Sequence, residues 1–184
     1  MRFLVLLMFF PALASAQPAS ITPASVIGFL RLDMNKDRVD ERVLLTLDRS
    51  GVIDLYIQPE NASAPVVYFE AFSATNGTPP ALLATDDGGF EVAQWMRHGQ
   101  GSTYFSERIN WVEGENAGYY TIGLTLRFYP RDENADVIDC TVDFLNGRLE
   151  TTINEGAMQV MDVNMPPTPP GAPLPAGWDE LCDG

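Results

Sequence analysis

The segment that decides the fold is "YYTIGLTLRFY", residues 119–129. Its side chains alternate in character, because Thr121, Thr125 and Arg127 lie between apolar neighbours. The apolar positions are Tyr120, Ile122, Leu124, Leu126 and Phe128. Successive side chains of a β-strand point to opposite faces, so a period of two predicts a strand with one buried face. We therefore expect Phe128 to be buried and Arg127 to be exposed.

A hairpin is predicted shortly after this strand. "VIDCTVDFL", residues 137–145, alternates in the same way, and "RLETTIN", residues 148–154, follows it closely. Asn146 and Gly147 separate the two runs. Asn-Gly is a strong hairpin signal, because both turn positions must accept a positive φ. The sequence therefore predicts an antiparallel hairpin that turns at these two residues, with Phe144 on its buried face.

Shorter apolar and β-branched runs predict further strands along the chain. They lie at residues 25–32, 42–48, 53–58, 66–71, 90–96, 104–112 and 157–163. Turns rich in Gly, Asn, Pro and Asp separate them. No long stretch combines a helical period with caps, so the crossover helices that a parallel sheet needs are missing. The predicted fold is all-β, an antiparallel meander that forms a sandwich or a barrel-like sheet.

The first residues have the order of a secretory signal peptide. In "MRFLVLLMFFPALASA", residues 1–16, Arg2 precedes an unbroken apolar run, and small residues mark a cleavage site after Ala16. The run is shorter than the ~20 apolar residues that span a bilayer, which disfavours a membrane anchor. We expect a signal peptide at residues 1–16, a β-domain at residues 17–165, and a periplasmic or secreted product without membrane insertion after cleavage.

The chain is strongly acidic, with 25 Asp and Glu against 11 Lys and Arg and a net charge of −14. Removal of residues 1–16 takes away one Arg and no acid, so the net charge becomes −15. Nucleic acid is disfavoured as a partner, because phosphate contacts need Lys and Arg. Anionic membrane surfaces are disfavoured for the same reason. The charge suits cation binding or a basic partner.

The end of the chain, residues 166–184, is rich in proline and carries the second of two cysteines. An even pair in an exported protein usually forms a disulfide. A bond between Cys140 and Cys182 would close a loop of about 42 residues, worth roughly 4 kcal/mol in the chain-entropy treatment. The tail is then a strap drawn back across the sheet, with Trp178 packed on it. The alternatives are two free thiols and a free tail.

One short segment, "DMNKDRVDE" at residues 33–41, carries a pattern of oxygen ligands. Hard cations such as calcium need several oxygens around one point. Positions one, three, five and nine hold Asp33, Asn35, Asp37 and Glu41, and Val39 at position seven would supply its carbonyl. The sequence predicts a calcium site here, and the alternative is an acidic turn between two strands.

At these residues the segment resembles the D-x-[DN]-x-D-G-x-x-[DE] calcium loops of FG-GAP (VCBS, integrin-like) repeats. The chain also resembles a loose group of uncharacterised exported proteobacterial proteins, in which such a loop precedes a β-rich body and a late "CDV(N/D)-x-L-x-G" segment. That segment is "CTVDFLNG" here, residues 140–147. The resemblance implies a structural calcium site and no known activity. The loop Gly at position six is Arg38 here, and the bidentate Glu of an EF-hand would be Leu44.

Other candidates for chemistry are isolated. His98 is the single histidine, and the sequence lacks a G-x-S-x-G nucleophile to accompany it. Asp86 and Asp87 could form an acid pair, although acids in the turns of an acidic chain are usually solvated. The chain also has three tryptophans, Trp95, Trp111 and Trp178. Packing in the core is the favoured interpretation for them, ahead of a sugar-stacking platform.

The leading hypothesis is an exported non-catalytic β-domain, with a structural calcium site, that binds an unknown protein or envelope component. The first alternative is a small secreted hydrolase that uses paired carboxylates. The second is an acidic inhibitor or immunity protein whose surface mimics nucleic acid. No residue is assigned a catalytic role, and the oligomeric state is left open.

Overall fold

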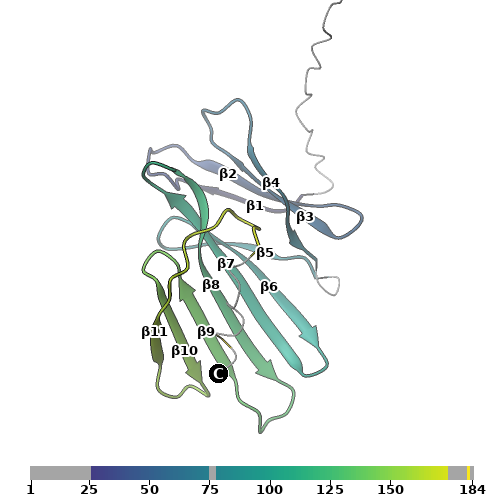
Figure 1. Cartoon of the computed structure of the whole chain (residues 1–184). Helices are drawn as coiled ribbons and strands as arrows, with labels where there is room; N and C mark the ends of the chain where they lie inside the picture. The colour runs from purple at the N-terminus through teal and green to yellow at the C-terminus, as the bar shows by residue number, and fades with distance from the viewer. Residues whose placement is uncertain (1–25, 75–77, 174–181, 183–184) are drawn as a thin grey trace, which may run out of the picture.

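The computed structural model of the chain describes residues 26–74, 78–173 and 182. These residues form two antiparallel sheets, which confirms the prediction of an all-β fold (Figure 1). The strands are β1 (Val26–Leu32), β2 (Glu41–Leu47), β3 (Val52–Gln58), β4 (Val66–Ser73), β5 (Ala81–Ala84), β6 (Phe90–His98), β7 (Gly101–Val112), β8 (Gly118–Pro130), β9 (Ile138–Asp143), β10 (Arg148–Ile153) and β11 (Gln159–Asp162). Every predicted strand is present, and β5 is the one that the sequence did not predict.

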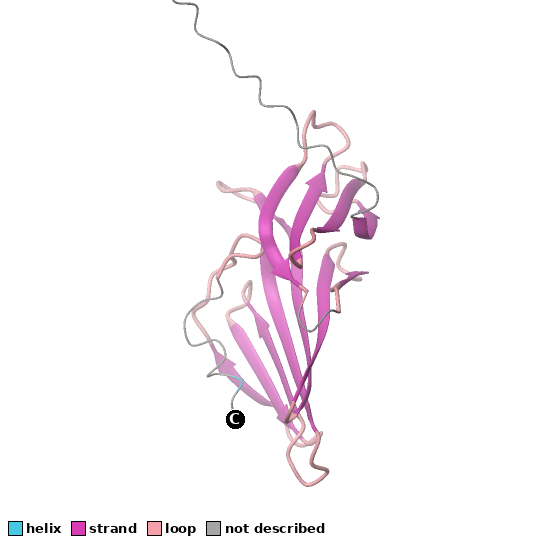
Figure 2. Ribbon diagram, turned by 90° about the vertical axis from the view of Figure 1, so that its right-hand side faces the viewer, coloured by secondary structure: helices cyan, strands magenta, loops and turns pink. Residues whose placement is uncertain are grey.

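The two sheets are consecutive meanders. The small sheet has the order β1-β2-β3-β4, and the large sheet runs from β5 to β11 in chain order. Neither sheet closes on itself, so the fold is a sandwich and the barrel alternative is wrong. The small sheet lies across one end of the large sheet, whose long strands continue beyond it (Figures 1 and 2). One half of the large sheet therefore needs another cover for its apolar face.

The alternation that predicts β8 holds over its second half. Thr121, predicted on the exposed face, is fully buried instead, because a bulge between Gly123 and Thr121 pairs it with inward-facing Ile109. Arg127 is exposed as expected, and Leu124 is fully buried. Phe128 was predicted to be buried and is half-buried instead. It lies near the end of β8 and beyond the small sheet, where the ring of His98 stacks on it with the centroids 5.6 Å apart.

The hairpin between β9 and β10 is present, but its turn differs from the prediction. Asp143 pairs with Arg148, so four residues form the turn. Gly147 has a φ of 61°, while Asn146 is absent from the positive-φ residues. Asn146 acts through its side chain, since its Nδ2 donates to Asp143 Oδ2 at 2.8 Å. The predicted two-residue turn is therefore wrong, because Asp143 organises a longer one that buries Phe144.

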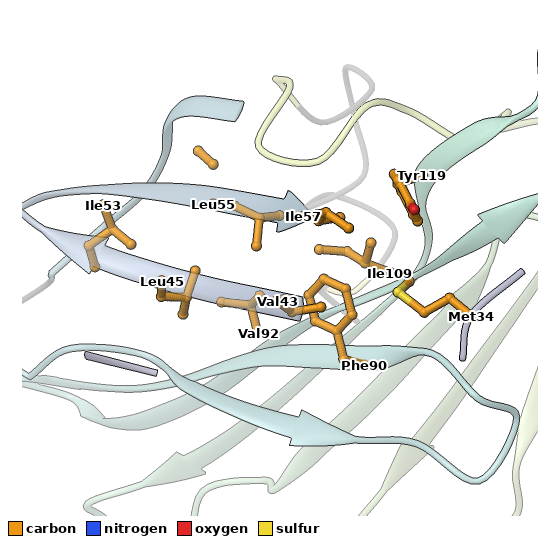
Figure 3. Packing of buried hydrophobic residues seen from close by; sticks show 11 residues of the cluster. Met34, Val43, Leu45, Ile53, Leu55, Ile57, Phe90, Val92, Ile109 and Tyr119 are labelled. Atoms are coloured by element: carbon orange, nitrogen blue, oxygen red, sulfur yellow. The ribbon is translucent and has the colours of Figure 1, made fainter. Parts of the chain in front are cut away.

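The main core lies between the small sheet and the covered half of the large sheet (Figure 3). It is built from side chains that alternate along neighbouring strands. They are Val43 and Leu45 of β2, Ile53, Leu55 and Ile57 of β3, Phe90 and Val92 of β6, and Ile109 of β7. Each such side chain stabilises the fold by roughly 1.5–3 kcal/mol when fully buried. β5 closes one margin of this core, where Gly28 of β1 lies against Leu82.

A second core covers the far half of the large sheet. It contains Leu124, Val142 and Leu149, packed by Val163 and Met165, which directly precede the tail. Its buried cysteines, Cys140 and Cys182, are joined in the predicted disulfide, with their Cα atoms 5.7 Å apart. Val163 and Met165, together with Cys182 of the tail, thus cover the part of the face that the small sheet does not reach.

The Pro-rich tail also lies between the sheets as a strap. Thr168 and Thr121 of β8 exchange backbone hydrogen bonds, with N···O distances of 2.8 and 3.3 Å. Gly171 has a φ of 71°, and a Cβ there would lie 2.3 Å from the Cα of Ala71. The predicted strap is confirmed for these residues. Trp178 lies outside the described residues, so its packing stays a prediction.

The predicted signal peptide, with cleavage after Ala16, also lies outside the described residues. In the part of the chain that the structure describes, no helix has the length and apolar character to cross a membrane. The disulfide is compatible with an oxidising compartment such as the one export would reach.

Removal of the disulfide tests the strap. The bond closes a loop with a sequence separation of 42 residues. The double variant Cys140→Ala and Cys182→Ala should lose about 4 kcal/mol of unfolding free energy, because its unfolded chain regains loop entropy. Urea denaturation with and without reductant measures this loss. The double variant is the control, since reductant should leave its midpoint unchanged. Two alkylatable thiols in the unreduced wild type would contradict the pairing.

Candidate functional site

The 33–41 segment is a tight loop between β1 and β2. Leu32 pairs with Glu41, so the strands hold the two ends of the loop side by side. Inside it, the Arg38 amide donates to Asp33 Oδ2 at 3.0 Å. The Asp37 amide donates to Asn35 Oδ1 at 3.0 Å. The structure therefore gathers Asp33, Asn35 and Asp37 into one loop whose amides point at their own side-chain oxygens.

The loop backbone is strained at two positions. Lys36 has a φ of 60° and Arg38 has a φ of 71°. The left-handed region costs a non-glycine residue roughly 1–2 kcal/mol. Calcium loops of the resembling type place Gly at position six, and Arg38 adopts the same left-handed backbone without the benefit of Gly. Position six therefore has the left-handed backbone of such calcium loops, although Arg38 replaces their Gly.

Glu41 is turned inward and joins the loop to the large sheet. It is 1% exposed, and its Oε2 accepts a 2.8 Å hydrogen bond from the amide of buried Met34. The Tyr119 hydroxyl, on β8, donates to Glu41 Oε1 at 3.3 Å. Burial raises the pKa of Glu41, while the hydrogen bonds from Met34 and Tyr119 oppose the shift. Burial, and then the Glu41 carboxylate, raise the pKa of Tyr119, so its phenol stays protonated and donates.

Asp33 carries the unsatisfied group of the loop. Its Oδ2 is bound by the Arg38 amide, but its Oδ1 is buried and has no hydrogen-bond partner. The turn between β5 and β6 lies close by, since a Cβ on Gly88 would be 3.8 Å from the Asp33 carbonyl oxygen. A buried polar atom without a partner costs about 1–3 kcal/mol, and such atoms often mark the place of an ion or a water.

The loop offers oxygen atoms of mixed type to a cation. Within residues 26–74, 78–173 and 182, no three His, Cys, Asp or Glu side chains are grouped as a metal site. The gathered set is two carboxylates, Asp33 and Asp37, with the Asn35 amide. Each oxygen that accepts one hydrogen bond retains a second lone pair. The Val39 amide donates to Asp37 Oδ1 at 2.8 Å, and the direction of the Val39 carbonyl stays a prediction.

The lone histidine lies far from the loop along the sheet. His98 ends β6, and its Nε2 is 3.0 Å from the Thr103 hydroxyl. One face of its ring stacks on Phe128. His98 therefore contacts one hydroxyl group and one aromatic ring at the end of the large sheet.

Glu107 is a buried acid that the sequence analysis missed. It lies on the inner face of β7, where it accepts hydrogen bonds from the Thr121 hydroxyl at 3.2 Å and from the Gly171 amide of the strap. Burial raises the pKa of Glu107 to about 7. The sequence does contain a sign of this burial. Side chains two positions apart in a strand point to the same face, so Glu107 lies on the face of the apolar residues Phe105 and Ile109.

Comparison with known proteins finds no matching family model, curated protein or solved structure for this chain. The function is therefore inferred from the geometry of the chain's own residues.

The strap contact at Glu107 predicts a pH dependence. Its folded pKa of about 7 lies above the ordinary 4.5, so between these values the folded protein holds a proton that the unfolded chain releases. Stability should fall by about 3 kcal/mol as the pH rises through this window and then level off. Glu107→Gln should remove this slope and exceed the wild type in stability at pH 8. Urea denaturation from pH 5 to 8 measures both, with exposed Glu133→Gln as the matched control. An unchanged slope in Glu107→Gln would refute the assignment.

Proposed function

We propose that this protein is a non-catalytic β-domain, exported to the periplasm or secreted, that binds an envelope component and carries a structural calcium ion in its 33–41 loop. The observation that supports the calcium site is the buried, unpartnered Oδ1 of Asp33.

A calcium ion suits this loop for three reasons. The ligand atoms that the side chains offer are all oxygens. Hard cations such as calcium prefer oxygen ligands, whereas zinc sites use nitrogen and sulfur. Calcium tolerates irregular coordination and completes its shell with carbonyls and water. A cation would also pair with Asp33 Oδ1 and offset the repulsion between Asp33 and Asp37.

The position of the loop suggests a structural role for the ion. Glu41 ends the loop and accepts a hydrogen bond from Tyr119 of the other sheet. Met34, within the loop, is part of the main core. A bound ion that orders residues 33–41 therefore also secures the contact between the two sheets.

The two buried carboxylates, Glu41 and Glu107, do not form the acid pair of a hydrolase. A hydrolase of the carboxylate type needs two acids that face one cleft. Glu41 is committed to Met34 and Tyr119, and Glu107 lies beneath the strap at Gly171. Both acids are therefore occupied by contacts within the fold.

Thermal unfolding with millimolar calcium against chelator tests the calcium site. Binding at one hundred times the dissociation constant should add roughly 2.7 kcal/mol of stability. Asp33→Ala should lose the calcium-dependent shift, because it removes the unpartnered oxygen. Asp132→Asn, at the opposite end of the large sheet, should keep the shift. Arg38→Gly should raise stability by about 1 kcal/mol without calcium and strengthen calcium binding, because Gly adopts the left-handed backbone without strain.

The outcomes separate the alternatives. No calcium-dependent shift in the wild type would mean that the segment is an acidic turn. A shift that survives Asp33→Ala would place the calcium elsewhere on the acidic surface.

A further inference from the structure

The outer face of the large sheet carries a row of aromatic and charged side chains. The strand register places Trp95 beside Tyr104, Tyr104 beside Arg127, and Arg127 beside Asp139. The strap contacts Glu107 of β7, and the small sheet packs on Ile109 of the same strand. Both residues lie an odd number of positions from Tyr104, so they point to the opposite face. This outer face is therefore separate from both cores.

Three rings on this face form one platform, in which Tyr104 meets Trp95 edge-on at 60° and Tyr129 is tilted by 32° from Trp95. The centroid of Trp95 lies 5.3 Å from that of Tyr104 and 5.6 Å from that of Tyr129. Trp95 is 48% exposed and Tyr129 is 36% exposed. The interpretation of Trp95 as a core residue is thus wrong. Trp111 does pack against the main core, beside Tyr119.

A hollow lined by five polar or charged residues and Val137 adjoins the platform at Tyr129. Its lining residues are Arg127, Tyr129, Val137, Asp139, Thr152 and Glu155. Arg127 Nε donates to Asp139 Oδ2 at 2.7 Å, and its Nη1 lies 3.5 Å from the Tyr129 hydroxyl. Side-chain pairing holds the guanidinium and carboxylate in place, so the polar groups of the hollow are preorganised next to the rings.

The charges of this region balance, although the chain as a whole is at −14. Arg97 lies on the same face as Tyr129, because both pair with Ser102. Arg97 and Arg127 offset Asp139 and Glu155. A balanced set of donors and acceptors suits a neutral polar ligand better than a cation or an anion. The exposed rings require that this ligand also have an apolar face.

We propose that the outer platform, made of Trp95, Tyr104, Arg127, Tyr129, Asp139 and Glu155, binds a neutral polysaccharide. A pyranose ring has an apolar C–H face that packs on the aromatic rings, and its rim of hydroxyls both donates and accepts. Arg127 would donate to these hydroxyls, and Asp139 and Glu155 would accept from them. The platform and hollow span β6 to β10, about 19 Å at the usual strand spacing, which suits an internal stretch of a chain rather than a single sugar.

This inference rests on the proposed role as a binding domain and names its ligand class. It does not depend on calcium. The platform and the 33–41 loop belong to different sheets, so their tests are separate.

Affinity electrophoresis tests the platform with four neutral polymers: soluble starch, xylan, a β-1,3-glucan and a mixed-linkage β-glucan. At least one should retard the wild-type protein. Trp95→Ala should weaken that binding by about tenfold or more, as loss of a central aromatic contact does. Asp139→Asn keeps the shape of the side chain and should also weaken binding, because it replaces an acceptor oxygen with a donor.

The matched control is Phe69→Ala. Phe69 is 68% exposed on β4 of the small sheet, so this variant removes an exposed aromatic ring outside the platform. It should bind like the wild type. Melting curves should show that Trp95→Ala and Phe69→Ala remain folded.

Three results would overturn the proposal. The first is that none of the four polymers retards the protein. The second is binding that Trp95→Ala and Asp139→Asn leave unchanged, or that Phe69→Ala weakens equally. The third is self-association in ultracentrifugation that Trp95→Ala abolishes while no polymer binds, which would make the platform a contact between copies of this chain. Polymer binding without a calcium shift would refute the calcium site alone, and a calcium shift without polymer binding would refute the platform alone.

Discussion

The structure depends on how the inner face of the large sheet is covered. That face is apolar over both halves of its long strands, but the small sheet covers one half, where Phe90 and Ile109 are buried. The other half carries Leu124, Val142 and Leu149, which would face water without a second cover. Several such side chains represent several kcal/mol of burial, comparable with the net stability of a domain. Val163, Met165 and Cys182 provide that cover, and the disulfide holds Cys182 against Cys140 of β9.

This arrangement explains why polar groups occur in the interior. A strap of irregular backbone brings amides that need acceptors into an apolar layer. Thr121 accepts from the Thr168 amide, and Glu107 accepts from the Gly171 amide. Glu41 has the same role at the other junction, where it accepts from Met34 and Tyr119. Both buried acids therefore satisfy donors at the places where irregular segments meet the sheets.

The same arrangement leaves the outer face of the large sheet for contact with other molecules. Long antiparallel strands hold Trp95, Tyr104 and Tyr129 in fixed positions, and Arg127 and Asp139 orient each other beside them. Rigid strands are a precise support for a binding surface, because their side-chain directions are set by the pleat. The inner face is used for stability, and the outer face is the surface that we propose for ligand binding.

The sequence by itself determined the all-β class, most strand positions and the pairing of two cysteines, because these follow from local alternation, turn residues and an even cysteine count. It also singled out Asp33, Asn35 and Asp37 as one loop, since their spacing is local. It did not reveal β5, which has four residues and too short a pattern. Tertiary structure alone decided which face of each strand is covered: alternation separates Trp95 from Met96 and Phe105 from Tyr104, but it does not say which set meets another layer. That choice depends on contacts between residues far apart in the chain, and it placed Trp95 outside and Glu107 inside.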